Sequence, residues 1–338
     1  MTPLVNLLVF FGLVLLAALV WTVHRLRGGR ARGRRALLED ALKHAWHREQ
    51  EGQGTTIAGI AGTLGIGEET AVALVERLQS AGLVTLRASR IHLAEAGRKH
   101  ALQIVRAHRL WERYLADETG VGPERWHIEA ERIEHALTPD EVERLAERLG
   151  NPLYDPHGDP IPTATGELPR SDWQPLSDLA SGVAARITHI EDEPDIVYAQ
   201  LLAEGLYPGM EILVEARSAQ RIVCSEEGRQ FALAPIVARN VSVVPLPMQT
   251  RPAARPTATL AQVGPGQAAE VVSIGGTCHG LERRRLMDLG IVCGTRIDFD
   301  RKGLWGGVNA YRVRGATIAL RTEQAAAVRV RMLEDAGR

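Results

Sequence analysis

The sequence of 338 residues predicts a multidomain α+β protein. Three observations support this fold class. An uncharged stretch of 21 residues near the start predicts a transmembrane helix. A change from helical to alternating hydrophobic spacing after it predicts a winged helix-turn-helix, followed by a helical segment. An internal repeat in the C-terminal half predicts two small SH3-like β-barrels.

The composition excludes several classes of protein. The chain has 40 Lys+Arg and 41 Asp+Glu, so it carries no overall excess of positive charge. Any binding of nucleic acid therefore requires a local basic patch. Cys224, Cys278 and Cys293 form no CxxC pair, which argues against a disulfide framework and a four-thiolate zinc site. We find no set of nucleophile, base and orienting residue, so the sequence predicts no enzymatic activity.

Residues 1–24 are predicted to be a membrane anchor. Pro3–Val23 carries no charge and, as a helix, matches a hydrocarbon core of about 30 Å. The juxtamembrane segment 25–35 is rich in arginine, and the positive-inside rule keeps such a segment in the cytoplasm. A cleaved signal peptide is disfavoured because its charges should precede the apolar stretch. We therefore expect a single-pass cell-membrane protein whose other domains are cytoplasmic.

Residues 36–100 are predicted to form the winged helix-turn-helix. Helical spacing of apolar residues predicts three helices, over 34–50, 57–64 and 68–80. Alternation of apolar and polar residues then predicts the two strands of the wing, over 83–87 and 90–93. Glu68 and Glu69 suit the positive end of the recognition helix, although they oppose DNA phosphates. The residues predicted to contact DNA are Thr70, Arg77, Arg87 and Arg90.

Two further predicted helices, over 104–119 and 123–135, carry imidazole and carboxylate side chains at helical spacing. The first carries His108 and Glu112, and the second carries His127, Glu131, Glu134 and His135. Such a mixed nitrogen and oxygen set suits Mn²⁺ or Fe²⁺, and Zn²⁺ also fits. The alternative is a solvated charged face, in which neighbouring arginines pair with these acids. Those arginines are Arg109, Arg113, Arg125 and Arg132.

Residues 36–162 resemble the diphtheria toxin repressor (DtxR) family of metal-dependent transcriptional regulators. The matching motifs are RAHRLWERYL (106–115), WHIEAERIEH (126–135), LTPDEVERLAERLGNP (137–152) and DPHGDPIP (155–162). The resemblance implies a homodimer, a helical metal-binding and dimerisation domain over 101–162, and binding of operator DNA that metal favours. It implies metal ligands at Asp40, His108, Glu112, His127, Glu131, Glu134 and His135.

The ligand pattern is closer to the manganese type, because family members of the iron type carry cysteine at the position of Glu131. Lys43 stands one helical turn after Asp40, where manganese-type members carry another acid. Its ammonium would replace or repel one ion of a two-metal site, so we expect one metal ion. The recognition helix also departs from the family, with Val72 and Ala73 where relatives carry small polar residues.

The C-terminal half is predicted to hold two copies of one domain, over 179–246 and 260–332, with linkers at 163–178 and 247–259. Matching segments recur 85 to 87 residues apart. The second copy resembles the FeoA domain associated with ferrous iron transport, and the first is closer to the C-terminal barrel of DtxR-type regulators. Iron-type relatives take further ligands from that barrel, but Glu191, Asp192 and Glu193 are interpreted here as surface acids.

Two functions follow as hypotheses. The leading one is a membrane-anchored, Mn²⁺- or Fe²⁺-dependent DNA-binding regulator that controls genes of metal-ion homeostasis. The alternative is a membrane-tethered FeoA-like module of a ferrous iron transporter that no longer binds DNA.

Overall fold

The computed structural model describes residues 33–169, 172–226, 229–247, 258–276, 278–303 and 307–333. The predicted membrane anchor and the arginines up to residue 32 lie outside this part of the chain. The described residues belong to two compact units. Unit 1 draws on residues 33–108, Glu131–Arg144 and Pro162–Glu167, and unit 2 draws on Arg109–Ala130, Leu145–Ile161 and the described residues from Leu168 to 333.

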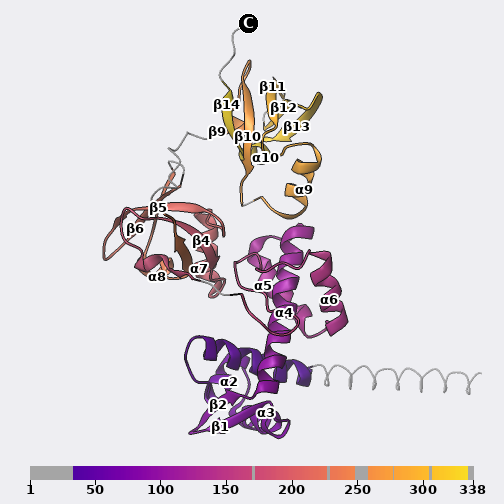
Figure 1. Cartoon of the computed structure of the whole chain (residues 1–338), viewed down its shortest axis with the longest axis vertical. Coiled ribbons are helices and arrows are strands. Elements are labelled where there is room, and N and C mark those ends of the chain that lie inside the picture. The colour runs from indigo at the N-terminus through magenta and orange to yellow at the C-terminus, as the bar shows by residue number, and fades with distance from the viewer. Residues whose placement is uncertain are drawn as a thin grey trace, which may run out of the picture. The chain divides into compact units, whose positions relative to one another are not determined.

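Unit 1 contains the predicted winged helix-turn-helix (Figure 1). Its elements are a first helix over 33–50, α2 (Ile57–Leu64), α3 (Glu68–Ser80), β1 (Val84–Arg87), β2 (Arg90–Leu93) and the start of α4 (Glu95–Glu118). The Thr56 side chain caps α2 by accepting a hydrogen bond from the Gly59 amide at 3.0 Å. Gly65 ends α2 in the left-handed conformation, with φ 61°.

Helix α3 buries one face and exposes the other. Its buried side chains recur at helical spacing: Ala71, Leu74, Val75 and Leu78. The wing that follows is an antiparallel hairpin whose turn residues, Ala88 and Ser89, have φ of 48° and 64°. The helix-turn-helix and its wing therefore agree with the elements predicted from hydrophobic spacing.

No single helix among the described residues has both the length and the hydrophobicity to cross a membrane. Helices α2 and α3 satisfy that criterion only when taken together, and they are bent by 114°.

Helix α4 begins nine residues earlier than the predicted start at residue 104. Its first turns are polar and include Gly97, so hydrophobic spacing does not reveal them. The backbone carbonyl oxygen of Leu83 lies 1.9 Å from where a Cβ on Gly97 would stand. Glycine at this position therefore lets α4 approach the residue that precedes the wing.

The predicted helix over 123–135 consists of a 3₁₀ turn, η1 (Pro123–Arg125), and an α-helix, α5 (Trp126–Glu134). Trp126 is buried and its indole N–H donates to the carbonyl oxygen of Val121 at 2.9 Å. Helix α6 (Pro139–Arg148) follows, and Thr138 caps it through reciprocal hydrogen bonds with Glu141.

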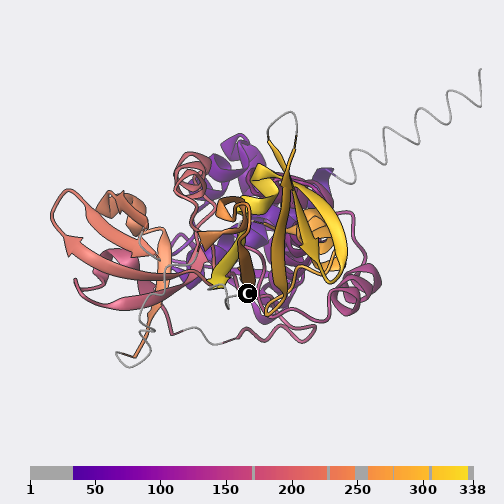
Figure 2. The same cartoon turned by 90° about the horizontal axis from the view of Figure 1, so that it is seen from above.

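The two β domains, residues 174–245 and 258–333, are six-stranded antiparallel sheets with the same connectivity. The first has the strand order β3-β8-β4-β5-β6-β7, and the second has β9-β14-β10-β11-β12-β13. Figures 1 and 2 show that both sheets are twisted. Irregularities of register also recur, between Ile187 and His189 in the first sheet and between Val271 and Ser273 in the second. The predicted duplication is thus present in the fold.

The elements of the first domain are β3 (Gln174–Pro175), η2 (Leu176–Asp178), β4 (Ala184–Ile190), α7 (Asp195–Ala203), β5 (Glu211–Arg217), β6 (Ile222–Glu226), β7 (Arg229–Leu233), α8 (Pro235–Ala238) and β8 (Val241–Pro245). Those of the second are β9 (Ala258–Thr259), η4 (Leu260–Gln262), β10 (Ala268–Ile274), α9 (Gly280–Asp288), β11 (Arg296–Lys302), β12 (Val308–Val313), β13 (Ala316–Arg321), α10 (Thr322–Ala326) and β14 (Val328–Leu333).

Both predicted linkers extend too far toward the C-terminus. The first sheet begins at Gln174 and the second at Ala258, inside the segments predicted as linkers. The reason is that Leu176 and Leu260, each just after the first short strand, are fully buried in the core of their domain. One buried leucine in a segment rich in proline and small residues gives no periodic signal.

Candidate metal centre

Unit 1 holds the first group of potential metal ligands, which we call the Lys43 cluster: Asp40, Lys43, His108, Glu134 and His135. Asp40 and Lys43 come from the first helix, His108 from α4, and Glu134 and His135 from the end of α5. The Lys43 ammonium lies 2.9 and 3.1 Å from the two carboxylate oxygens of Glu134. It also lies 3.2 Å from Nδ1 of His108, which contacts Glu134 as well.

The charges in the Lys43 cluster are paired. Burial raises the pKa of Glu134, but the hydrogen bond with His108 and the charge of Lys43 outweigh it, so the pKa lies below its ordinary value. His135 faces Glu39 through Nδ1 at 2.7 Å and Asp40 through Nε2 at 2.9 Å. Burial lowers the pKa of His135, but these two carboxylates raise it to about 9. Because the Lys43 ammonium already contacts both carboxylate oxygens of Glu134, the Lys43 cluster fits a divalent ion poorly.

Unit 2 holds the second group, which we call the His157 cluster: Glu112, His127, His157 and Asp192. Nδ1 of His127 lies 2.9 Å from an oxygen of Asp192 and 3.5 Å from an oxygen of Glu112. Nδ1 of His157 lies 3.7 Å from carboxylate oxygens of the same two acids. Four donor groups from four separate segments therefore converge.

His157 is the member of the cluster with the fewest hydrogen bonds to its side chain. It is 2 % exposed, and neither ring nitrogen has a hydrogen-bond partner among the described residues. Burial lowers the pKa of His157, but Glu112, Asp155 and Asp192 raise it to about 10. A buried polar group without a hydrogen bond is rare and calls for an explanation, such as a bound ion. Two imidazoles and two carboxylates are donors that suit a divalent transition metal, so the residues fit such an ion.

A second layer of contacts holds the His157 loop in place. Asp155 accepts hydrogen bonds from the backbone amides of His157 and Asp159, each at 2.9 Å. Asp159 in turn pairs with Arg109 at 2.9 Å and with His189 of β4 at 3.2 Å. These contacts fix the loop that carries His157 against the first β domain.

The structure distributes the seven predicted ligands unevenly. Glu112 and His127 lie in the His157 cluster, while Glu131 is exposed on α5. The remaining four lie in the Lys43 cluster: Asp40, His108, Glu134 and His135. Three of the arginines considered as their partners pair elsewhere, Arg109 with Asp159, Arg113 with Asp117 and Arg125 with Glu129.

The helical spacing in the sequence does not identify two members of the His157 cluster. His157 lies in the DPHGDPIP motif, where a histidine between two aspartates was the available signal. The prediction that Asp192 is a surface acid is wrong, since its side chain is 14 % exposed and contacts His127. Glu191 and Glu193 are exposed, as that interpretation predicts, although an oxygen of Glu193 also lies 3.3 Å from Nε2 of His127.

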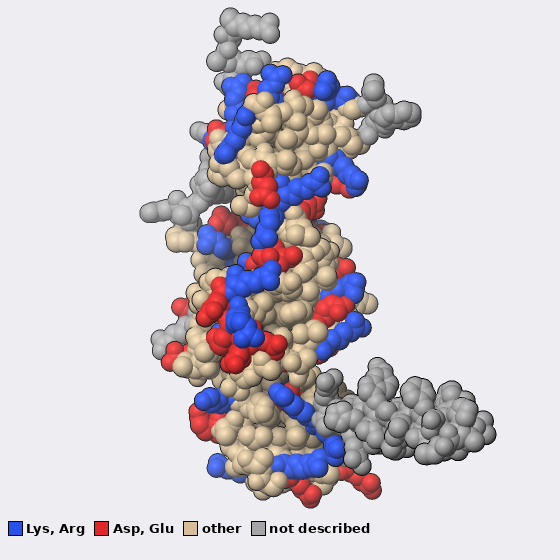
Figure 3. All heavy atoms as spheres, turned by 90° about the vertical axis from the view of Figure 1, so that its right-hand side faces the viewer, with Lys and Arg blue, Asp and Glu red and all other residues tan. Residues whose placement is uncertain are grey.

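The predicted DNA-contacting residues lie on exposed surfaces of unit 1. Thr70 and Arg77 are on the exposed face of α3. Arg87 and Arg90 are opposite each other beside the turn of the wing. Figure 3 shows acidic and basic side chains interspersed over the visible face of the molecule, as the balanced composition suggests.

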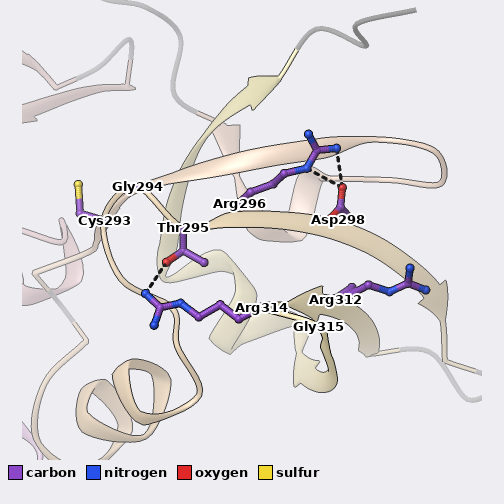
Figure 4. A pocket seen from close by; sticks show the side chains of 8 residues that line it. All are labelled: Cys293, Gly294, Thr295, Arg296, Asp298, Arg312, Arg314 and Gly315. Carbon is purple, nitrogen blue, oxygen red and sulfur yellow. Dashed lines mark hydrogen bonds and ion pairs between the residues drawn. The ribbon is translucent and has the colours of Figure 1, made fainter. Parts of the chain in front are cut away.

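A pocket in the second β domain is a less suitable metal site (Figure 4). Its lining includes one thiol, Cys293, and one carboxylate, Asp298, beside three arginines. Arg296 donates to Asp298 at 2.9 and 3.0 Å, so the carboxylate is already engaged. The arginine charges would repel a cation.

Comparisons with known proteins agree with this organisation. Residues 94–163 match the metal binding and dimerisation domain of the iron dependent repressor, and residues 174–245 and 258–332 each match the FeoA domain. The iron-dependent repressor IdeR of Mycobacterium leprae is 30% identical over 208 residues, which cover 57% of this chain and 90% of that protein. The diphtheria toxin repressor of Corynebacterium glutamicum is 30% identical and covers 60% of this chain and 93% of that protein.

Among solved structures, a manganese-dependent transcriptional repressor in complex with manganese aligns with a TM-score of 0.57 and 30% identity, covering 62% of this chain and all of that one. A winged helix joined to the matched metal-binding and dimerisation domain defines a metal-dependent transcriptional repressor. The chain belongs to the family of iron-dependent repressors that includes IdeR and the diphtheria toxin repressor. These relatives are regulators and not enzymes, which confirms the prediction that the chain has no enzymatic activity.

Proposed function

We propose that this protein represses genes of metal-ion homeostasis when a divalent ion binds to the His157 cluster. The observation that carries the proposal is the buried imidazole of His157, which has no hydrogen-bond partner among the described residues and lies beside two carboxylates. A bound ion would supply positive charge that holds Glu112, Asp192 and the two histidines together. Because binding stabilises one conformation by mass action, the metal concentration can set the DNA affinity.

The donor set favours Mn²⁺ or Fe²⁺ as the ion. Carboxylates and imidazoles are the ligands that these ions and Zn²⁺ accept, and the cluster contains no thiolate. The similarity to a manganese-dependent repressor supports Mn²⁺, and the similarity to IdeR supports Fe²⁺.

The surface that we assign to operator DNA combines α3 with the wing. Arg77, Arg87 and Arg90 are exposed there and can contact phosphates or base edges. Glu68 and Glu69 in the first turn of α3 oppose phosphates, so we expect the affinity to be weak, and the phosphate contacts of the three arginines should make it fall further as salt rises. As in the matched dimerisation domain, two copies of the chain would bind two half-sites.

The test is fluorescence anisotropy of the full chain on duplex DNA from its own upstream region, with and without Mn²⁺, Fe²⁺ or Zn²⁺. We expect metal to raise the affinity by roughly 5- to 150-fold, the usual range of coupling between two sites. His157→Ala should abolish this increase, because it removes a buried ligand. Glu323→Ala, which removes an exposed carboxylate of α10 in the second β domain, is the control and should retain it. An increase that survives His157→Ala would remove the His157 cluster from the mechanism.

We also propose that residues 3–23 anchor the protein in the cell membrane with its other domains in the cytoplasm. The full chain should remain with membranes after alkaline carbonate extraction, and a variant that lacks residues 1–32 should be released. Equal release of both proteins would argue against the anchor.

The duplicated FeoA match favours a second candidate function, a module tethered to a ferrous iron transporter. In that case a transporter would be recovered with the full chain from detergent-solubilised membranes. The same protein would show no metal-dependent DNA binding in the anisotropy test.

A further inference from the structure

We propose that Lys43 is a built-in cation which takes the place of a metal ion in the Lys43 cluster. Metal is therefore not expected to bind beside Lys43. The inference concerns unit 1 alone and does not depend on whether the His157 cluster binds metal.

The first argument is the position of the ammonium. Oxygen and nitrogen atoms of Asp40, Glu134 and His135 lie within 4.8 Å of one another, a spacing that can hold a metal ion. The Lys43 Nζ, however, contacts both oxygens of Glu134, at 2.9 and 3.1 Å. A metal ion bound to Glu134 would need the same lone pairs and would stand next to a positive charge.

The second argument is the orientation of His135. A histidine ligand offers one nitrogen lone pair to the metal. Both ring nitrogens of His135 instead face carboxylate oxygens, of Glu39 at 2.7 Å and of Asp40 at 2.9 Å. Glu39 also pairs with Arg35 at 2.6 Å. The imidazole and its carboxylates thus form a hydrogen-bonded group that uses the atoms a metal would need.

The third argument is burial. The side chains of Lys43 and Glu134 are 14 % and 1 % exposed, so the pair is largely removed from water. A buried carboxylate requires a compensating charge, and Lys43 supplies it permanently. Because Lys43 lies on the first helix and Glu134 at the end of α5, the pair links these two elements whether or not metal is available.

The test is the number of Mn²⁺ or Zn²⁺ ions bound per full chain, measured by plasma mass spectrometry after saturation and desalting. Lys43→Met removes the ammonium and keeps a side chain of similar length. We expect this variant to bind about one ion more than the wild type, and Lys43→Met/His135→Ala to lose the extra ion. Lys99→Met, which alters a lysine in the first turns of α4, is the matched control and should bind as many ions as the wild type.

His135→Ala in the wild-type background decides the question even if Lys43→Met does not fold. We expect it to leave the number of bound ions unchanged. The loss of one ion would show that metal binds beside Lys43 and would overturn the inference, as would a Lys43→Met protein that folds and gains no ion. If the wild type binds no divalent ion at all, the proposed function fails, whereas a gain by Lys43→Met would still support the inference.

Discussion

Gly158→Ala is expected to destabilise unit 2 by roughly 2–5 kcal/mol. Gly158 has φ 96°, a left-handed conformation that costs alanine about 1–2 kcal/mol. A Cβ at this position would stand 1.9 Å from the carbonyl oxygen of Thr188, so the loop must also move away from β4, at a cost of about 1–3 kcal/mol. That movement would break the hydrogen bond from the Ile190 amide to the carbonyl of His157 and displace the imidazole.

Hydrogen–deuterium exchange measures this effect, since peptides from residues 155–162 and from β4 should exchange faster in Gly158→Ala. Gly150→Ala is the matched control. Gly150 also has a positive φ, 76°, but nothing lies within 4 Å of the position of its missing Cβ. It should therefore cost only about 1–2 kcal/mol, from the backbone conformation alone. Equal losses in the two variants would mean that the close approach to Thr188 contributes nothing.

Glu134→Ala is expected to destabilise unit 1 by about 3–5 kcal/mol, because it leaves the ammonium of Lys43 largely buried without its carboxylate. Urea unfolding followed by the exchange of peptides from the first helix measures the loss. Glu134→Gln keeps an oxygen that can accept from Lys43 and should lose less. Glu76→Ala, on the exposed face of α3, should cost little.

The difference between Glu134→Ala and the wild type should depend on pH. The pKa of Glu134 in the folded protein lies below its ordinary value, so the ionised carboxylate stabilises the fold at neutral pH. This contribution is complete above the ordinary pKa of glutamate, about 4.3, and is lost as the pH falls through the lower folded value. A difference that grows on acidification would contradict the pairing with Lys43.

Much of the fold could be predicted from the sequence because its elements are local. Buried side chains of α3 recur every three or four residues, and Ala88-Ser89 separates two alternating strands. The start of α4 could not be predicted in this way, because the contact between Gly97 and Leu83 depends on tertiary packing. Leu176 and Leu260 are likewise single buried residues in segments without a pattern.

The candidate site was only partly predictable for a related reason. Glu112 and His127 belong to helices whose spacing indicates a ligand set. His157 and Asp192 come from a loop and from the segment before α7, and only the fold brings them beside those helices. Lys43 could be recognised from sequence as a departure from the family, but its contact with both oxygens of Glu134 required the structure.

The duplicated sheet has a consequence for the evolution of the protein. The first copy supplies Asp192 just before α7, whereas the equivalent segment before α9, residues 275–278, reads Gly-Gly-Thr-Cys and contains no carboxylate. The matched ranges also differ in charge, with five arginines against ten acids in 174–245 and eleven Lys+Arg against six acids in 258–332. Natural selection can therefore remodel the surface of the second copy without altering the contact that Asp192 of the first copy makes with His127.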